Sequence, residues 1–200
     1  MMANQLRPRY FDNARLAVDL ALALGAKGTD AGTMSNFSSV PTDWVCPGCA
    51  RSKREIARLD KNSNLYCAIH SHHDHLHEGI AETVGFSLLA IDQDLGAIME
   101  SMVRFSNSWV CMDCNMADGL AKRMICAPKY FSFSPAEIRK FIDVKHCASH
   151  KVIKDIAERT LLEIIDSYED ILEYCEGILY AKCPTSLENA LGATISHNLN

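Results

Sequence analysis

The chain has 200 residues, enough for one sizeable core but short for two full domains. Hydrophobic residues make up 48% and charged residues 22%, which excludes a disordered or fibrous protein, and no apolar run is long enough to span a bilayer. The net charge of −5 excludes nucleic-acid binding through an overall positive charge, so any such surface must be local.

The first half of the chain predicts two helices and a short strand. Leu16, Leu20 and Leu24 recur at helical spacing before Gly25, which predicts an amphipathic helix over residues 13–26. Residues 27–43 are rich in Gly, Ser, Thr and Asn and predict a linker, so residues 1–43 are expected to form an N-terminal helix and linker. A basic helix is expected over residues 52–59 and a strand over residues 65–70.

The second half predicts mainly helices. Residues 80–105 have helical spacing and predict a helical insert, and residues 115–123 predict a short helix. Ser134, Pro135 and Glu137 form a capping box that starts a helix ending near Val144. Residues 150–180 predict one long amphipathic helix with an acidic face. We therefore expect an α+β protein whose core spans residues 44–133 and whose residues 134–200 form a C-terminal helical region.

The cysteines predict a metal site. Cys46-Pro-Gly-Cys49 and Cys111-Met-Asp-Cys114 are two knuckles of the kind that close a tetrahedral four-thiolate zinc site, and Gly48 is expected to supply the turn conformation. An odd total of nine cysteines without a signal peptide favours metal thiolates in a reducing compartment, so a cytoplasmic protein is expected. Buried free cysteines are the alternative, and Cys147 with His146 and His150 is a candidate for a second site.

A histidine-rich stretch lies between the two knuckles. Residues 70–78 contain five histidines and two carboxylates. Alternate residues of a strand share a face, so Asp74 and His75 are expected to point in opposite directions. A carboxylate that binds a cation beside an imidazole that accepts a proton from water is typical of phosphodiester hydrolysis.

The order of these motifs resembles the HNH (ββα-metal) endonuclease family. The resemblance covers about residues 44–145 and depends on the first C-x-x-C, the Asp74-His75 dipeptide, Asn107 before the second C-x-x-C, and Asn115 directly after it. It implies a zinc-stapled ββα-metal core, broken here by the helical insert and flanked by N- and C-terminal helices.

The resemblance also implies roles for these residues. Asp74 and Asn115 would hold a catalytic Mg²⁺ or Mn²⁺, His75 would be the general base, and Asn107 would orient the loop. Because Glu78 stands where family members often carry Pro, His72, His73 and His77 remain alternatives for one of these roles. The substrate-binding candidates are the basic residues near the knuckles: Arg51, Lys53, Arg54, Lys122 and Arg123. The first three can equally form a solvated helix face.

Three functions are consistent with the sequence. The first is a metal-dependent endonuclease acting on nucleic acid, most readily DNA, and the second is a non-enzymatic zinc-stabilised module that binds nucleic acid or protein. A zinc deaminase is the third, although its H-x-E and P-C-x-x-C motifs are absent. The acidic C-terminal helix is a candidate for self-association or for binding a partner protein, and no membrane partner is expected.

Overall fold

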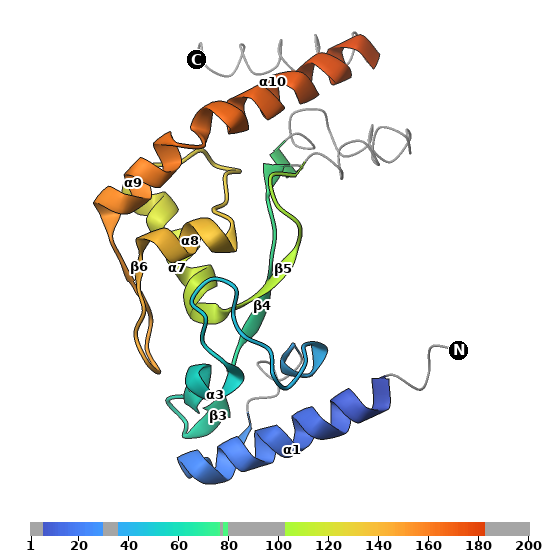
Figure 1. Ribbon diagram of the computed structural model, residues 1–200, viewed down its shortest axis with the longest axis vertical. Coiled ribbons are helices and arrows are strands. Elements are labelled where there is room, and N and C mark those ends of the chain that lie inside the picture. The colour runs from blue at the N-terminus through green and yellow to red at the C-terminus, as the bar shows by residue number, and fades with distance from the viewer. Residues whose placement is uncertain (1–5, 30–35, 77, 80–102, 183–200) are drawn as a thin grey trace, which may run out of the picture.

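A two-stranded antiparallel sheet that leads directly into a helix forms the centre of the molecule (Figure 1). The computed structural model describes residues 6–29, 36–76, 78–79 and 103–182. The elements in chain order are α1 (Leu6–Leu24), β1 (Gly28–Thr29), η1 (Phe37–Ser39), α3 (Lys53–Ile56), β2 (Arg58–Leu59), β3 (Asn64–Tyr66), β4 (Ile69–His72), β5 (Ser108–Cys111), α7 (Met112–Ile125), α8 (Pro135–Phe141), β6 (Ile142–Asp143), β7 (Lys151–Val152), α9 (Lys154–Leu162) and α10 (Ile165–Lys182).

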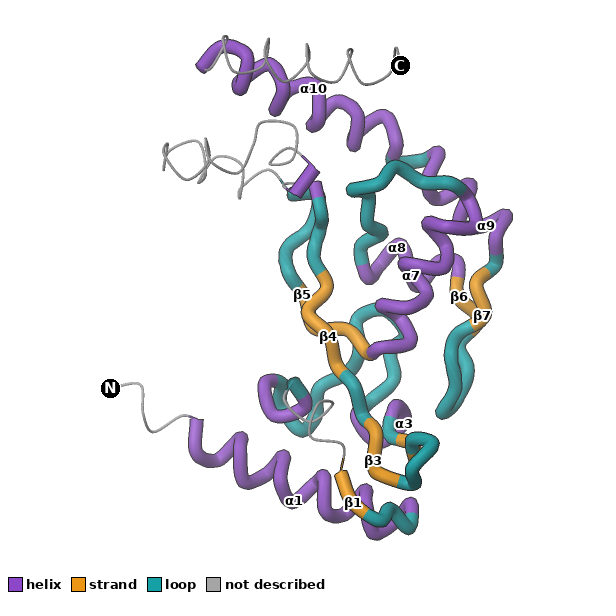
Figure 2. The backbone as a smooth tube through the Cα atoms, turned by 180° about the vertical axis from the view of Figure 1, so that it is seen from behind, coloured by secondary structure: helices purple, strands orange, loops and turns teal. Residues whose placement is uncertain are grey.

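The small sheets and several helices confirm the predicted α+β class. Strands β4 and β5 pair from Ile69 opposite Cys111 to His72 opposite Ser108. In the described part of the chain, the other sheets have the orders β1-β3-β2 and β6-β7. Helices α1 and α10 lie at opposite ends of the molecule, and the tube in Figure 2 shows the same arrangement from behind.

Local sequence signals explain where several helices begin and end. Helix α8 starts at Pro135 behind Ser134, whose side chain accepts from the Glu137 amide, so the predicted capping box is confirmed. Helix α7 ends at Cys126, which adopts the left-handed conformation and whose N–H donates to the Lys122 carbonyl. The described helices include none that combines the length and apolarity needed to cross a bilayer.

Other predicted elements are shorter or divided. The basic helix expected over 52–59 is the single turn α3 followed by β2, and the strand expected over 65–70 is divided between β3 and β4. The single helix expected over 150–180 is wrong, because residues 151–152 form β7 and the rest is divided into α9 and α10. The predicted helical insert lies largely at residues 80–102, outside the described residues.

An aromatic cluster joins the C-terminal helices to the central unit. Phe131, Phe133 and Phe141 are fully buried, and Phe133 packs edge-on against each of the other two rings at a centroid distance of 4.8 Å. Buried Asp118 on α7 accepts from the Phe133 amide at 2.9 Å. This contact fixes the segment before α8 against α7, and it also sets the position of the Phe133 carbonyl, which faces the end of β4.

A buried lysine on α3 connects α1 to the segment that contains η1. The Lys53 ammonium is fully buried and donates to Asn13 Oδ1, the Phe37 carbonyl and the Val40 carbonyl at 2.5, 2.6 and 2.9 Å. Burial lowers its pKa to about 8, so the side chain is mainly protonated at neutral pH. The position of Lys53 in the core does not fit the expectation that it binds substrate.

Replacing Lys53 by Met is expected to destabilise the fold by at least about 2 kcal/mol, because Asn13 Oδ1 and the Phe37 carbonyl lose their donor and each such buried acceptor costs about 1–3 kcal/mol. The Val40 carbonyl still accepts from Asn13 Nδ2. The measurement is urea unfolding at pH 7. Arg54→Met is the matched control, since it removes a neighbouring exposed charge, and it should change stability little. Equal losses in the two variants would contradict a structural role for Lys53.

Candidate metal centres

The two knuckles come together as the sequence predicts. The sulfurs of Cys46, Cys49, Cys111 and Cys114 are buried and lie within 4.8 Å of one another. The Cys46–Cys114 and Cys49–Cys111 pairs of Sγ atoms are 3.7 and 3.6 Å apart. Tetrahedral zinc with Zn–S bonds of about 2.3 Å requires sulfurs about 3.8 Å apart, so the cluster fits a zinc ion.

The first knuckle depends on space at Gly48 and on backbone conformation at Ala50. A Cβ at Gly48 would lie 2.8 Å from Cys114 Sγ, so only glycine fits there. The left-handed residue of the turn is Ala50, with φ of 61°. Gly48 is therefore required for the close approach of the second knuckle, and the expectation that it supplies the turn conformation is wrong.

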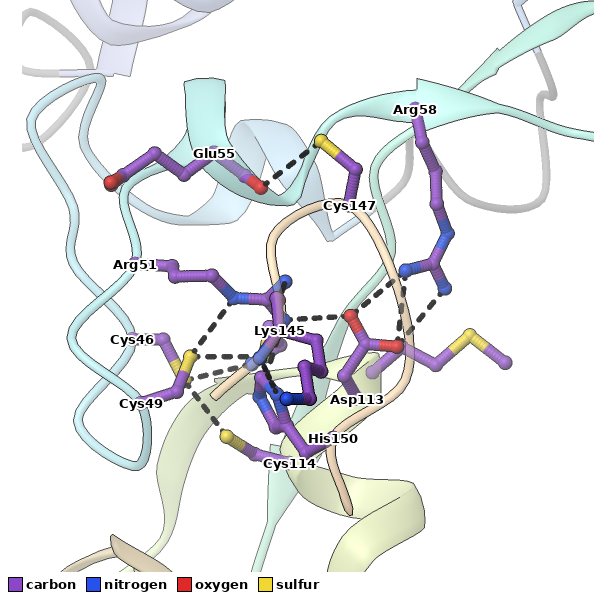
Figure 3. A network of polar contacts seen from close by, with 12 residues as sticks. Cys46, Cys49, Arg51, Glu55, Arg58, Asp113, Cys114, Lys145, Cys147 and His150 are labelled. Carbon is purple, nitrogen blue, oxygen red and sulfur yellow. Dashed lines mark hydrogen bonds and ion pairs between the residues drawn. The ribbon is translucent and has the colours of Figure 1, made fainter. Parts of the chain in front are cut away.

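Polar groups enclose the sulfurs (Figure 3). The buried Arg51 guanidinium donates to Cys49 Sγ at 3.3 Å and to Cys111 Sγ at 3.5 Å. It also donates to Asp113 at 2.7 Å, and Asp113 accepts from Arg58 as well. Four thiolates and one Zn²⁺ ion would together have a net charge of −2, and the positive charge of Arg51 offsets part of it. Arg51 is thus a partner of the cluster, and its burial does not fit the substrate-binding role expected for it.

Hydrogen bonds among the four thiols divide their proton affinities. The bond with Cys111 raises the pKa of Cys114 well above its usual range, and for Cys111 the bond with Cys114 lowers the pKa, but the bonds with Cys46 and Cys49 and burial outweigh it and raise the pKa. Hydrogen bonds from Cys111 and Cys114 lower the pKa of the Cys46 thiol to about 7, and the same two partners lower the pKa of Cys49 well below its usual range. Burial lowers the pKa of His150, but hydrogen bonds to Cys111 and Cys49 outweigh it and raise the pKa to about 9. His150 therefore belongs to the surroundings of the four-cysteine cluster.

The candidate second site at Cys147 is not assembled. The Cys147 thiol donates to the carbonyls of Glu55 and Ala57, whereas His150 faces the four cysteines. Within the described ranges, the other group with ligand spacing is His73, His75 and Glu78.

The histidine-rich segment after β4 alternates between buried and half-exposed residues. His72, Asp74 and Leu76 are buried, whereas His73 and His75 are half-exposed. Asp74 and His75 therefore point in opposite directions, as expected for an extended segment. His77 lies outside the described residues.

Asp74 has backbone partners. Its carboxylate accepts from the Leu76 amide at 3.2 Å and from the Arg104 amide at 2.8 Å, and only 1% of the residue is exposed. Each amide uses a different oxygen, so both oxygens have a backbone partner. The carboxylate holds the segment after β4 against the segment before β5, so the contacts of Asp74 are those of a structural residue.

His72 is the residue of this segment that meets Asn115. His72 Nδ1 lies 3.3 Å from Asn115 Oδ1, and His72 Nε2 lies 2.7 Å from the Phe133 carbonyl. Stacking on Phe105 at 5.4 Å fixes the imidazole ring further. The sequence included His72 only as an alternative to the Asp74-His75 assignment.

His75 and His73 both contact Glu78. His75 Nδ1 is 2.7 Å from Glu78 Oε2, and His73 Nε2 is 3.3 Å from Glu78 Oε1. Burial raises the pKa of Glu78, but hydrogen bonds from His75 and His73 outweigh it and lower the pKa below its usual value. Glu78 is thus a carboxylate with two imidazole partners, a role that the sequence did not assign to it.

The remaining candidates lie on or near α7. Asn107 is exposed immediately before β5. Lys122 forms an ion pair with Asp118 at 2.9 Å. Asn115 and the exposed Arg123 line the same cavity of about 370 Å³.

A comparison of the chain with family models, curated proteins and solved structures found no match. The function must therefore be inferred from the geometry of the four-cysteine cluster and of the histidine-rich segment after β4.

Proposed function

We propose that the protein is a zinc-stabilised, metal-dependent endonuclease of the HNH type. In this proposal a divalent cation binds between His72 and Asn115, and His75 accepts the proton of the attacking water. The observation that carries the proposal is the contact of His72 with Asn115 where the β4–β5 sheet leads into α7. This ββα order matches the arrangement that the sequence resemblance implies.

The hydrogen bonds of His72 suit a metal ligand. The Phe133 carbonyl can only accept, so Nε2 carries a proton, and in the Nε2–H tautomer Nδ1 presents a lone pair to Asn115 Oδ1. With this assignment of the Asn115 amide, two acceptors face each other, and a cation between them would satisfy both. A histidine that binds a metal characteristically donates its other N–H to a carbonyl.

The choice of His72 changes the expected cation. Mg²⁺ prefers oxygen ligands, whereas imidazole nitrogen suits transition metals. With one nitrogen ligand and one amide oxygen, we expect Mn²⁺ to support cleavage better than Mg²⁺. The cation would stabilise charge on the phosphate and on the leaving oxygen.

His75 has the surroundings of a general base. Glu78 accepts from its Nδ1–H, which leaves the lone pair on Nε2 of a half-exposed ring. A carboxylate that orients an imidazole in this way fixes the tautomer that can accept a proton. His75 keeps its proposed role, and the metal ligand moves from Asp74 to His72. Because His72 faces inward and His75 outward, the proposal requires the scissile phosphate to reach both side chains around the end of this segment.

The nucleic-acid surface in this proposal is small. Arg123 is exposed beside Asn115 along the same cavity, and it would approach a phosphate oxygen. Arg54 remains exposed on α3. Few phosphate contacts agree with the net charge of −5 and predict weak binding of DNA with a shallow dependence on salt concentration.

Nicking of supercoiled plasmid by the zinc-loaded protein with Mn²⁺ tests the proposal. His75→Ala is expected to lower the cleavage rate about 10²- to 10⁴-fold, the usual contribution of a positioned general base. Asn115→Ala removes a proposed metal ligand and is expected to lower the rate as well. His146→Ala removes an exposed histidine outside the site and should cleave like the wild type. Failure of the wild type to cut duplex DNA, single-stranded DNA and RNA would overturn the proposal, as would full activity of His75→Ala.

A second candidate function is a zinc-stabilised binding module without catalysis. Met116, Leu120 and Met124 form an exposed apolar stripe along α7, a surface that suits a protein partner better than a phosphate backbone. This function predicts that partner binding is unaffected by His75→Ala and that added Mn²⁺ causes no cleavage.

A further inference from the structure

Three side chains after β4 direct their ligand atoms to one point outside the four-cysteine cluster. One ligand atom from each of His73, His75 and Glu78 lies within 4.8 Å of the others. Each Glu78 oxygen contacts one imidazole nitrogen, at 3.3 Å for His73 and 2.7 Å for His75. The two rings are also close, with centroids 4.4 Å apart.

The backbone explains this convergence. His73 and His75 lie on the outer side of an extended segment because alternate residues share a face. Asp74 and Leu76 lie on the inner side, where the Asp74 carboxylate binds two amides and Leu76 is fully buried. The chain then turns, and the Glu78 amide donates to the His75 carbonyl at 3.0 Å. The turn places Glu78 beside both imidazoles.

The spacing suits coordination of one ion. In a tetrahedral site, metal bonds of about 2.0–2.2 Å to nitrogen and oxygen place neighbouring ligand atoms about 3.3–3.6 Å apart. The Glu78–His73 contact of 3.3 Å lies at the edge of that range, and the Glu78–His75 contact of 2.7 Å would lengthen by about 0.6 Å when an ion binds. The three side chains are between 33% and 42% exposed, which leaves room for water on the remaining positions of the ion.

We propose that His73, His75 and Glu78 form a second metal site, an open site of two histidines and one carboxylate for a divalent transition metal. Two imidazoles and a carboxylate suit Zn²⁺, Fe²⁺, Co²⁺ or Ni²⁺, whereas Mg²⁺ and Ca²⁺ prefer oxygens. The site differs from the four-cysteine cluster in ligand type, since nitrogen and oxygen replace sulfur. It also differs from the proposed cation position between His72 and Asn115, which lies on the inner side of the segment.

This metal site does not depend on the proposed nuclease activity. It does affect that proposal, because a metal bound to Nδ1 of His75 would replace Glu78 as the group that orients the ring. The tautomer would then carry its proton on Nε2, and His75 would no longer act as a base. An ion in the second site and water activation by His75 are therefore mutually exclusive states.

Cobalt binding to the full chain, loaded with one zinc ion per molecule, tests the site. Co²⁺ is added to this protein and followed by equilibrium dialysis and by visible absorption. We expect one further equivalent to bind at His73, His75 and Glu78, with the weak ligand-field bands of nitrogen and oxygen ligands and without a thiolate charge-transfer band. Cobalt held between His72 and Asn115 would instead be retained in His73→Ala and Glu78→Gln. His73→Ala, His75→Ala and Glu78→Gln should each weaken binding by at least the roughly 10- to 100-fold that loss of a supporting residue costs.

The control variant is His146→Ala, which removes an exposed histidine outside the three ligands and should bind cobalt like the wild type. One retained zinc per molecule shows that each variant is folded. The proposal is overturned if the zinc-loaded wild type takes up no cobalt, if His75→Ala and Glu78→Gln bind it as the wild type does, or if the bound cobalt shows a thiolate charge-transfer band. Because the readout is metal binding, a protein without nuclease activity can still pass this test.

Discussion

Loss of one ligand from the four-cysteine cluster, as in Cys114→Ser, is expected to unfold the centre of the chain. The cluster joins residues 62 positions apart, through the contact of Cys49 with Cys111. The cluster also fixes the first turn of α7, which directly follows β5, and the beginning of the loop that carries Arg51. A structural zinc site contributes about 10–16 kcal/mol of apparent binding free energy, whereas a whole domain is stable by only about 5–15 kcal/mol.

Thermal unfolding by circular dichroism, with zinc content measured on the same samples, checks this expectation. Cys126→Ser is the matched control, because Cys126 is exposed and lies outside the cluster. It should keep one zinc ion and the melting temperature of the wild type. A zinc-free Cys114→Ser variant that melts cooperatively at the wild-type temperature would show that packing alone holds this region together.

Signals that depend on local geometry could be predicted from the sequence. The two C-x-x-C motifs indicated a four-cysteine cluster because two cysteines three residues apart on a turn can approach one ion. The capping box at Ser134 predicted the start of α8 because its hydrogen bonds form within four residues. Both signals are independent of how distant parts of the chain pack.

Residues whose roles depend on distant partners could not be predicted. Arg51 and Lys53 have the composition of a basic surface, yet both are buried because sulfurs and carbonyls from elsewhere in the chain surround them. One of the two partners of Asp74 is the amide of Arg104, thirty residues later. No pattern of spacing carries such information.

The candidate site illustrates the same limit. The alternation of faces between Asp74 and His75 was predicted by strand geometry, but which face meets α7 was not. The structure directs His72, Asp74 and Leu76 inward, and His72 is the residue that reaches Asn115. An assignment shifted by two residues preserves the face, which explains why the sequence could not distinguish Asp74 from His72.

Asp113→Ala is expected to destabilise the protein by about 3–5 kcal/mol while the cysteines remain intact. The Asp113 carboxylate is 2% exposed and accepts from Arg51 at 2.7 Å and from Arg58 at 2.9 Å. Its removal leaves the Arg51 guanidinium buried without its carboxylate, and breaking a buried pair from one side has this cost. Because Arg51 keeps its contacts with Cys49 and Cys111, we expect a loss of stability near the lower end of this range.

Urea unfolding of zinc-loaded protein measures the effect, and two further variants show its origin. Arg58→Ala removes the partner whose side chain is 22% exposed, so a smaller loss is expected, because solvent screens part of that interaction. Asp143→Ala removes the carboxylate of an exposed pair with Lys145 and should change stability little. If all three variants lost the same free energy of unfolding, burial of Arg51 would not be the cause. A loss that decreases in the order Asp113→Ala, Arg58→Ala, Asp143→Ala would show that the unpaired guanidinium of Arg51 destabilises the metal centre.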